Sequence, residues 1–122
     1  MDKADKLSCR PDFTVLVYPA FLSVDGVNLS KEITVSSDTP PAFIVQAEDD
    51  KAFVASSTAY YLGLAKADVP CELHIFPRGG HGYGLRRTKE TVACWPDLCE
   101  TWLKGEGVIR DVDASENTIG TK

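Results

Sequence analysis

The chain has 122 residues, a formal net charge of −5 and an isoelectric point near 4.9. Nucleic-acid binding requires clustered lysines and arginines, so this acidic balance predicts no nucleic-acid partner. No apolar run reaches the roughly 18 residues of a membrane span, so we also expect no association with a membrane. With 43% apolar and 25% charged residues, the composition is typical of a folded domain rather than a disordered chain.

The N-terminal stretch MDKADKLSCRPDF has no apolar segment of the kind found in secretory signal peptides. We expect a cytoplasmic protein if Met1 is the natural start, and otherwise the location is unknown. Residues 1–105 are interpreted as one folded portion, and the polar residues 106–122 as a tail.

Three short apolar runs predict β-strands: residues 13–19 (FTVLVYP), 42–47 (AFIVQA) and 71–77 (CELHIFP). The first two are apolar on both faces, which is typical of strands in a parallel sheet. Residues 51–70 space their apolar side chains three and four apart, which predicts a helix. A closing helix is expected from about Pro96 to Lys104. The predicted fold class is α/β, with a short, mostly parallel sheet of about three main strands and two flanking helices.

The connection from residue 20 to residue 41 is long for a compact domain. It contains Asp25 and Gly26 between apolar residues, which is a strong signal for a two-residue turn joining two strands. We therefore predict a small hairpin in this connection.

The four cysteines contain no CxxC pair, and they are too few for a disulfide scaffold in a chain of this length. Cys71 and His74 are three apart in a predicted strand, so their side chains point to opposite faces. The sequence therefore predicts no metal site. We expect all four cysteines to be small buried thiols.

Titratable side chains follow the second and third predicted strands. Glu48, Asp49 and Asp50 come directly after residues 42–47, and His81 lies in the loop after residues 71–77. Because the carboxyl ends of neighbouring parallel strands meet, we expect an acid and His81 to lie close together. A carboxylate that accepts from Nδ1–H of a histidine orients it as a general base. Four glycines, at positions 79, 80, 82 and 84, would let the loop aim the ring over the sheet.

Two plainer interpretations of these residues stay open. The acidic run could cap the following helix, and His81 could be a surface residue in a flexible loop. The order of an acid and then a histidine at successive strand ends favours a functional pair.

The stretches RPDFTVLVYPAFL, TPPAFIVQAEDD, YYLGLAKADVPCELHIFPRGGHGYGLR and WPDLCETWL resemble the C-terminal part of α/β-hydrolase esterases. The group it resembles most is the bacterial acetyl-esterase and xylan-esterase-like one, also called dienelactone-hydrolase-like, over about residues 8–104. The resemblance implies a partial α/β-hydrolase fold and a Ser–Asp–His triad whose serine lies in a GxSxG motif. By motif position, Asp50 matches the acid, Asp49 is the second candidate, and His81 matches the general base. No metal and no organic cofactor are implied.

The chain departs from this pattern because it contains no GxSxG motif and no HGG-type oxyanion segment. Ser56 and Ser57 fall in a predicted helix rather than on a strand-to-helix elbow. We therefore interpret the chain as the C-terminal segment of a serine esterase that supplies the Asp–His pair but lacks the nucleophile, and we expect the isolated chain to be inactive. The substrates implied are short acyl esters, with acetylated sugars as one candidate.

The alternative function is a truncated, non-catalytic homodimeric module, and a site built from Ser, His and Asp of different subunits is a third interpretation. In the family, the first strand of this chain would pair with an earlier strand. Its edge, from Phe13 to Tyr18, would then be apolar, uncharged and exposed, which favours association. We expect a homo-oligomer that pairs through this edge about a two-fold axis.

Overall fold

The computed structural model describes residues 6–110 of the chain. Its centre is one sheet of three parallel strands in the order β1, β2, β3, formed by Thr14–Val17, Ala42–Ala47 and Cys71–Phe76. All three lie where the apolar runs predicted them. In the register, Leu16 is opposite Ile44, and Ile44 is opposite Leu73. This arrangement confirms the predicted α/β class with a short parallel sheet.

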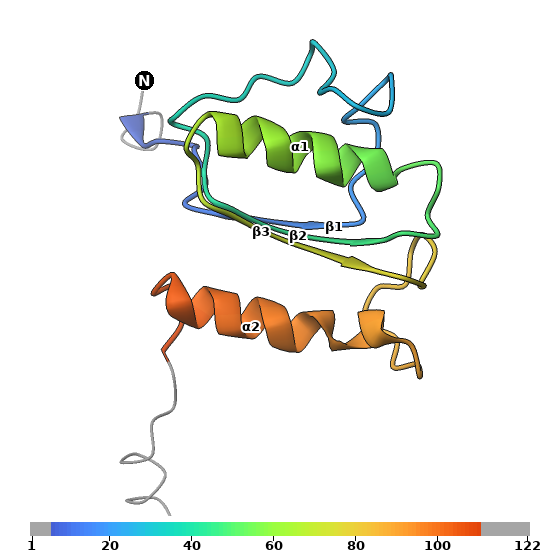
Figure 1. Ribbon diagram of the computed structural model, residues 1–122. Coiled ribbons are helices and arrows are strands. Elements are labelled where there is room, and N and C mark those ends of the chain that lie inside the picture. Colours follow the sequence, from blue (N-terminus) through green and yellow to red (C-terminus); the bar gives the residue numbers. More distant parts are fainter. Residues whose placement is uncertain (1–5, 111–122) are drawn as a thin grey trace, which may run out of the picture.

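Two helices cover the opposite faces of the sheet, as Figure 1 shows. Helix α1, Val54–Lys66, links β2 to β3 and packs on one face, and α2, Trp95–Gly105, packs on the other. A 3₁₀ turn, Thr91–Cys94, leads into α2, and Pro96 in the first turn suits the helix start because its missing N–H would have no partner there. Both helices agree with the sequence-based prediction.

Strand β2 forms the middle of the core, since all six of its residues are buried. Its side chains alternate between the two faces. Phe43 and Val45 belong to a cluster with Trp102 of α2, whereas Ile44 belongs to a cluster with Leu64 of α1. Each fully buried side chain of this size contributes about 1.5–3 kcal/mol relative to an exposed one. The central strand is therefore held from both sides.

The outer strand β1 is only half-buried along its whole length, in contrast to β2. The backbone N–H groups of Thr14 and Tyr18 point toward β2, since they bond to the carbonyls of Pro41 and Val45 at 2.9 Å each. The backbone N–H and C=O groups of successive residues in a strand point to opposite sides. Those of Val15 and Val17 therefore face the open edge of the sheet. Within residues 6–110, β1 pairs with β2 alone.

The long connection between β1 and β2 reverses direction, but the predicted two-residue hairpin is wrong in detail. Ser23 and Leu29 form a single isolated antiparallel bridge, with five residues between them. The Asp25 carboxylate explains the difference, because its Oδ1 accepts from the backbone N–H groups of Val27 and Asn28 at 2.8 and 2.7 Å. Those groups are thereby bonded to a side chain rather than to an opposite strand.

The expectation of four buried thiols is also wrong. Cys99 is buried and Cys71 partly buried, but Cys9 and Cys94 are exposed, since they lie before β1 and at the end of the 3₁₀ turn. Helix α2 ends at Gly105, and residues 111–122 of the predicted tail lie outside the described residues. No helix within residues 6–110 is long and apolar enough to cross a membrane.

Candidate active site

Asp50 and His81 lie together at the carboxyl ends of β2 and β3. Asp50 follows β2 by three residues and is 6% exposed, and its Oδ2 is 2.7 Å from His81 Nδ1. The His81 side chain is 42% exposed. A carboxylate in this place makes Nδ1 the protonated nitrogen and leaves Nε2 as the proton acceptor. The geometry suits general acid–base chemistry.

The loop that carries His81 is shaped by its glycines, all four of which have positive φ. At Gly82, with φ of +87°, a side chain would strain the backbone although the space around it is open. At Gly79, with φ of +153°, a Cβ would also lie 3.0 Å from Val92 and 3.3 Å from Ala47 and Tyr83. These positions fix the direction in which the loop returns over the sheet.

Asp49 does not contact the histidine ring but holds its loop. Its Oδ1 accepts from the backbone N–H of Gly80 at 2.7 Å, and its Oδ2 accepts from that of Gly79 at 3.3 Å. Glu48 is exposed and pairs at 3.4 Å with Lys51, which is also exposed. Of the three acids in the run, the structure places only Asp50 against His81.

Two further residues of this network were not singled out from the sequence as part of the site. Gln46, in β2, donates from Nε2 to Asp50 Oδ2 at 2.7 Å, and Ser57, in α1, donates to Gln46 Oε1 at 2.6 Å. Both are fully buried. The available signal was an amide within an otherwise apolar strand, because a buried polar side chain needs a partner.

Aromatic rings surround the imidazole. The rings of Tyr18 and Phe53 lie 4.8 and 5.1 Å from that of His81, centroid to centroid. Phe21 lies 5.0 Å from Phe53 and is 80% exposed. Tyr18 and Phe21 have φ of +41° and +63°, which is uncommon for residues other than glycine and costs about 1–3 kcal/mol each. Such strain is typical of functional segments.

Tyr83 packs against Tyr18 and so belongs to the same group of aromatic residues near His81. Its ring packs edge-on against that of Tyr18 with centroids 4.9 Å apart, and the residue is 5% exposed. Its hydroxyl has no hydrogen-bond partner within the described residues. Burial, and to a smaller extent the nearby Tyr18 and Asp50, raises the pKa of Tyr83 well above its usual range. Tyr83 is therefore neutral and acts in packing rather than as a base.

Neither helical serine near the pair is placed as a nucleophile. Ser56 is 3% exposed, and its Oγ accepts from the backbone N–H of Leu22 at 3.1 Å, while Ser57 is bonded to Gln46. Among residues 6–110, no three His, Cys, Asp or Glu side chains are grouped so as to hold a metal ion.

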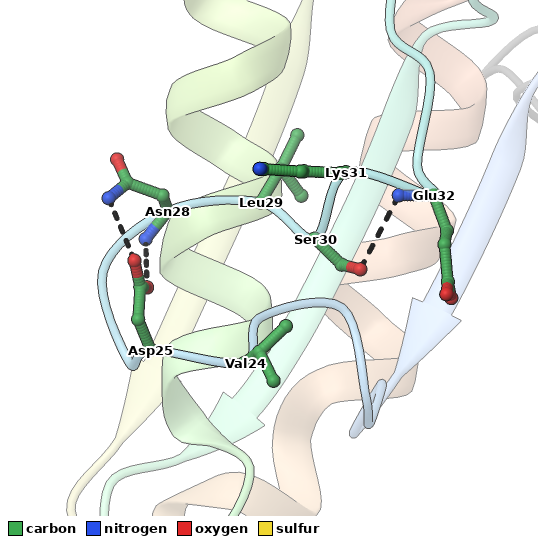
Figure 2. Close-up of a pocket in the computed structure, with 7 residues that line it drawn as sticks. All are labelled: Val24, Asp25, Asn28, Leu29, Ser30, Lys31 and Glu32. Atoms are coloured by element: carbon green, nitrogen blue, oxygen red, sulfur yellow. Dashed lines mark hydrogen bonds between the residues drawn. The ribbon is translucent and has the colours of Figure 1, made fainter.

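A hollow of about 450 Å³ lies in the connection between β1 and β2 and is shown in Figure 2. It is lined by Val24, Asp25, Asn28, Leu29, Ser30, Lys31 and Glu32, and none of these is the hydrogen-bond partner or a ring neighbour of His81. The Asp25 carboxylate is bonded within its own loop, and these bonds, led by the backbone N–H of Asn28, lower its pKa to about 2. The hollow is a product of loop structure, and the Asp50–His81 pair is the stronger candidate site.

The chain is similar to several carbohydrate-active hydrolases. A crystal structure of an acetyl ester–xyloside bifunctional hydrolase from Caldicellulosiruptor lactoaceticus matches it with a TM-score of 0.78 and 36% identity, over 88% of this chain and 47% of that one. The fold of the present chain is a partial α/β-hydrolase fold. An acetylxylan esterase from Xylanibacter ruminicola is 32% identical, over 62% of this chain and 21% of its own length. No family model matches the chain.

The partial α/β-hydrolase fold is what the sequence motifs predicted, and the resemblance to esterases extends over most of the chain. An endo-1,4-beta-xylanase B from Butyrivibrio fibrisolvens is 31% identical over 62% of this chain and 15% of its own length. The chain thus spans about half of the solved hydrolase and about a fifth or less of these two curated relatives.

Proposed function

We propose that this chain is the acid–base part of a serine ester hydrolase. His81 acts as the general base and general acid, and Asp50 holds it in the required tautomer. The observation that carries the proposal is the 2.7 Å contact between Asp50 Oδ2 and His81 Nδ1 at adjoining strand ends. A buried carboxylate behind a half-exposed imidazole is the arrangement by which acyl-transfer enzymes activate a hydroxyl nucleophile.

The nucleophile in this proposal is a serine outside these 122 residues. The sequence contains no GxSxG motif, and the two serines nearest the pair are buried and bonded elsewhere. In the reaction, His81 Nε2 would take the proton of that serine as its Oγ attacks the ester carbonyl. The same proton would then pass to the departing alkoxide. The isolated chain is therefore expected to have no esterase turnover.

The proposed substrates are short acyl esters of sugars. This choice is supported by the names of two similar proteins, an acetylxylan esterase and an acetyl ester–xyloside hydrolase. Aromatic rings beside His81, including the exposed Phe21, would suit the apolar face of a sugar ring.

A chimera tests the proposal. This chain would replace the matched portion of the Caldicellulosiruptor lactoaceticus hydrolase, and hydrolysis of 4-nitrophenyl acetate would be followed. We expect the chimera to be active, and we expect Asp50→Asn to lower kcat by about 10⁴-fold because it stabilises the wrong tautomer of His81. His81→Ala should lower kcat by at least the same factor. Glu48→Gln is the matched control, since this exposed neighbour should leave kcat within about twofold.

Two outcomes would contradict the proposal. A folded chimera without esterase activity would exclude the function, and an active chimera indifferent to Asp50→Asn and His81→Ala would exclude the assigned residues.

A second candidate is a non-catalytic homodimer, favoured by the open edge of β1. The outward backbone groups of Val15 and Val17 and the half-buried apolar side chains would be covered by a second copy paired antiparallel about a two-fold axis. Light scattering over a range of concentrations should then give the mass of a dimer. Val15→Pro should yield a monomer, because it removes an outward N–H without breaking a bond to β2. A monomer in the unmodified chain at every concentration would exclude this interface.

A further inference from the structure

A series of buried hydrogen bonds lies in the interior behind the Asp50–His81 pair. It begins at Ser57 in α1, crosses to Gln46 in β2, and ends on Asp50 Oδ2, over distances of 2.6 and 2.7 Å. Ser57 and Gln46 have no exposed surface at all. Burying an amide and a hydroxyl is unfavourable, and apolar side chains occupy the other positions of β2. The presence of Gln46 and Ser57 at buried positions therefore indicates a role that two apolar side chains could not fill.

The direction of these hydrogen bonds follows from the charge on Asp50. An ionised carboxylate only accepts, so the group facing it at 2.7 Å must be Nε2 of Gln46 and not Oε1. Oε1 then faces Ser57, whose hydroxyl supplies its one proton to it. Reversing the amide would place two acceptor oxygens in contact. Each of the two hydrogen bonds then joins one donor to one acceptor, and the orientation of the amide is determined.

We propose that Gln46 and Ser57 are positioning residues that hold the Asp50 carboxylate toward His81. Asp50 Oδ2 accepts from both Gln46 Nε2 and His81 Nδ1, so rotation of the carboxylate would break two bonds at once. Without Gln46, the carboxylate would turn about its Cβ–Cγ bond and its hold on Nδ1–H would weaken. The inference deepens the proposed function and depends on it for its importance in catalysis, but its geometry is testable without turnover.

The test is the tautomer of His81, measured on the full chain with ¹⁵N-labelled histidine. Two-bond ¹H–¹⁵N spectra at about pH 9, where an ordinary imidazole is neutral, distinguish protonated from unprotonated ring nitrogens. In the unmodified chain we expect a single tautomer with the proton on Nδ1. In Gln46→Leu and in Ser57→Ala we expect that single pattern to be lost and a mixture of both tautomers to replace it.

Matched controls separate positioning from a general loss of stability. Ser56→Ala removes the neighbouring buried hydroxyl, which bonds to Leu22 rather than to Gln46, and Ile44→Val trims the same strand without touching the network. Both should keep the Nδ1–H tautomer. His74, which is paired at 2.8 Å with Glu72 in β3, is an internal reference in every spectrum.

An unchanged His81 pattern in folded Gln46→Leu would overturn the inference. If Gln46→Leu does not fold, Ser57→Ala decides by the same criterion. A mixture in Ser56→Ala equal to that in Ser57→Ala would also overturn it, because the effect would not depend on Gln46. These results are independent of the esterase chimera, whose inactivity would remove the proposed function and leave the positioning geometry standing.

Discussion

Replacing Gly79 by alanine should damage the loop of His81 more than the same change at Gly82. At Gly79 the new Cβ would lie 3.0 Å from Val92 Cγ1 and 3.3 Å from Ala47 Cβ, and both neighbours are buried, so they would have to shift within a packed interior. Overpacking of this kind costs about 1–3 kcal/mol, and the positive φ adds about 1–3 kcal/mol. Gly79→Ala should therefore lower the free energy of unfolding by about 2–6 kcal/mol, a large part of a domain's stability.

Gly82→Ala provides the comparison, because its φ is also positive but nothing lies within 4 Å of the new Cβ. Only the backbone term remains, about 1–3 kcal/mol, so the two variants should differ by the cost of overpacking. Urea unfolding followed by tryptophan fluorescence measures both, and the midpoint of Gly79→Ala should be about 1 M below that of Gly82→Ala. Equal midpoints would refute the claim that close packing beneath the loop positions His81.

Two further predictions concern Asp49 and the thiols. Asp49→Ala should lower stability by about 1 kcal/mol and speed hydrogen exchange at the Gly80 amide, which loses its acceptor; an unchanged exchange rate would contradict the assigned contact. Burial, and secondarily the charge of Glu72, raises the pKa of Cys71 to about 11, so iodoacetamide at neutral pH should modify exposed Cys9 well before it. The Cys71 rate should keep rising with pH toward about 11, and equal rates for the two thiols near pH 7 would disprove this.

The main elements were predictable because each has a strong local pattern. The short run around Ile44 is almost wholly apolar, the run around Leu73 alternates apolar with polar residues, and both patterns are typical of strands. The three- and four-residue spacing before Asp68 is that of a helix. The adjacency of an acid and His81 followed from the rule that parallel strands end at one edge. That adjacency follows from the order of the elements along the chain alone.

The details of the site were not predictable in the same way. Asp49 and Asp50 both follow β2, and only the path of the turn decides which one meets the imidazole and which one holds the loop backbone. The bond between Gln46 and Ser57 joins residues 11 apart on different elements, so no local pattern reveals it. The predicted hairpin failed because a side chain, Asp25, bonds the N–H groups that a strand would have used.

The central claim is that this chain supplies the base but not the nucleophile of an ester hydrolase, and labelling by a fluorophosphonate tests it most directly. The intact mass would be measured for the isolated chain and for the chimera, each with and without His81→Ala. The account predicts no adduct on the isolated chain, and one adduct on the chimera that depends on His81. An adduct on the isolated chain that disappears in His81→Ala, or a chimera labelled equally without His81, would contradict it.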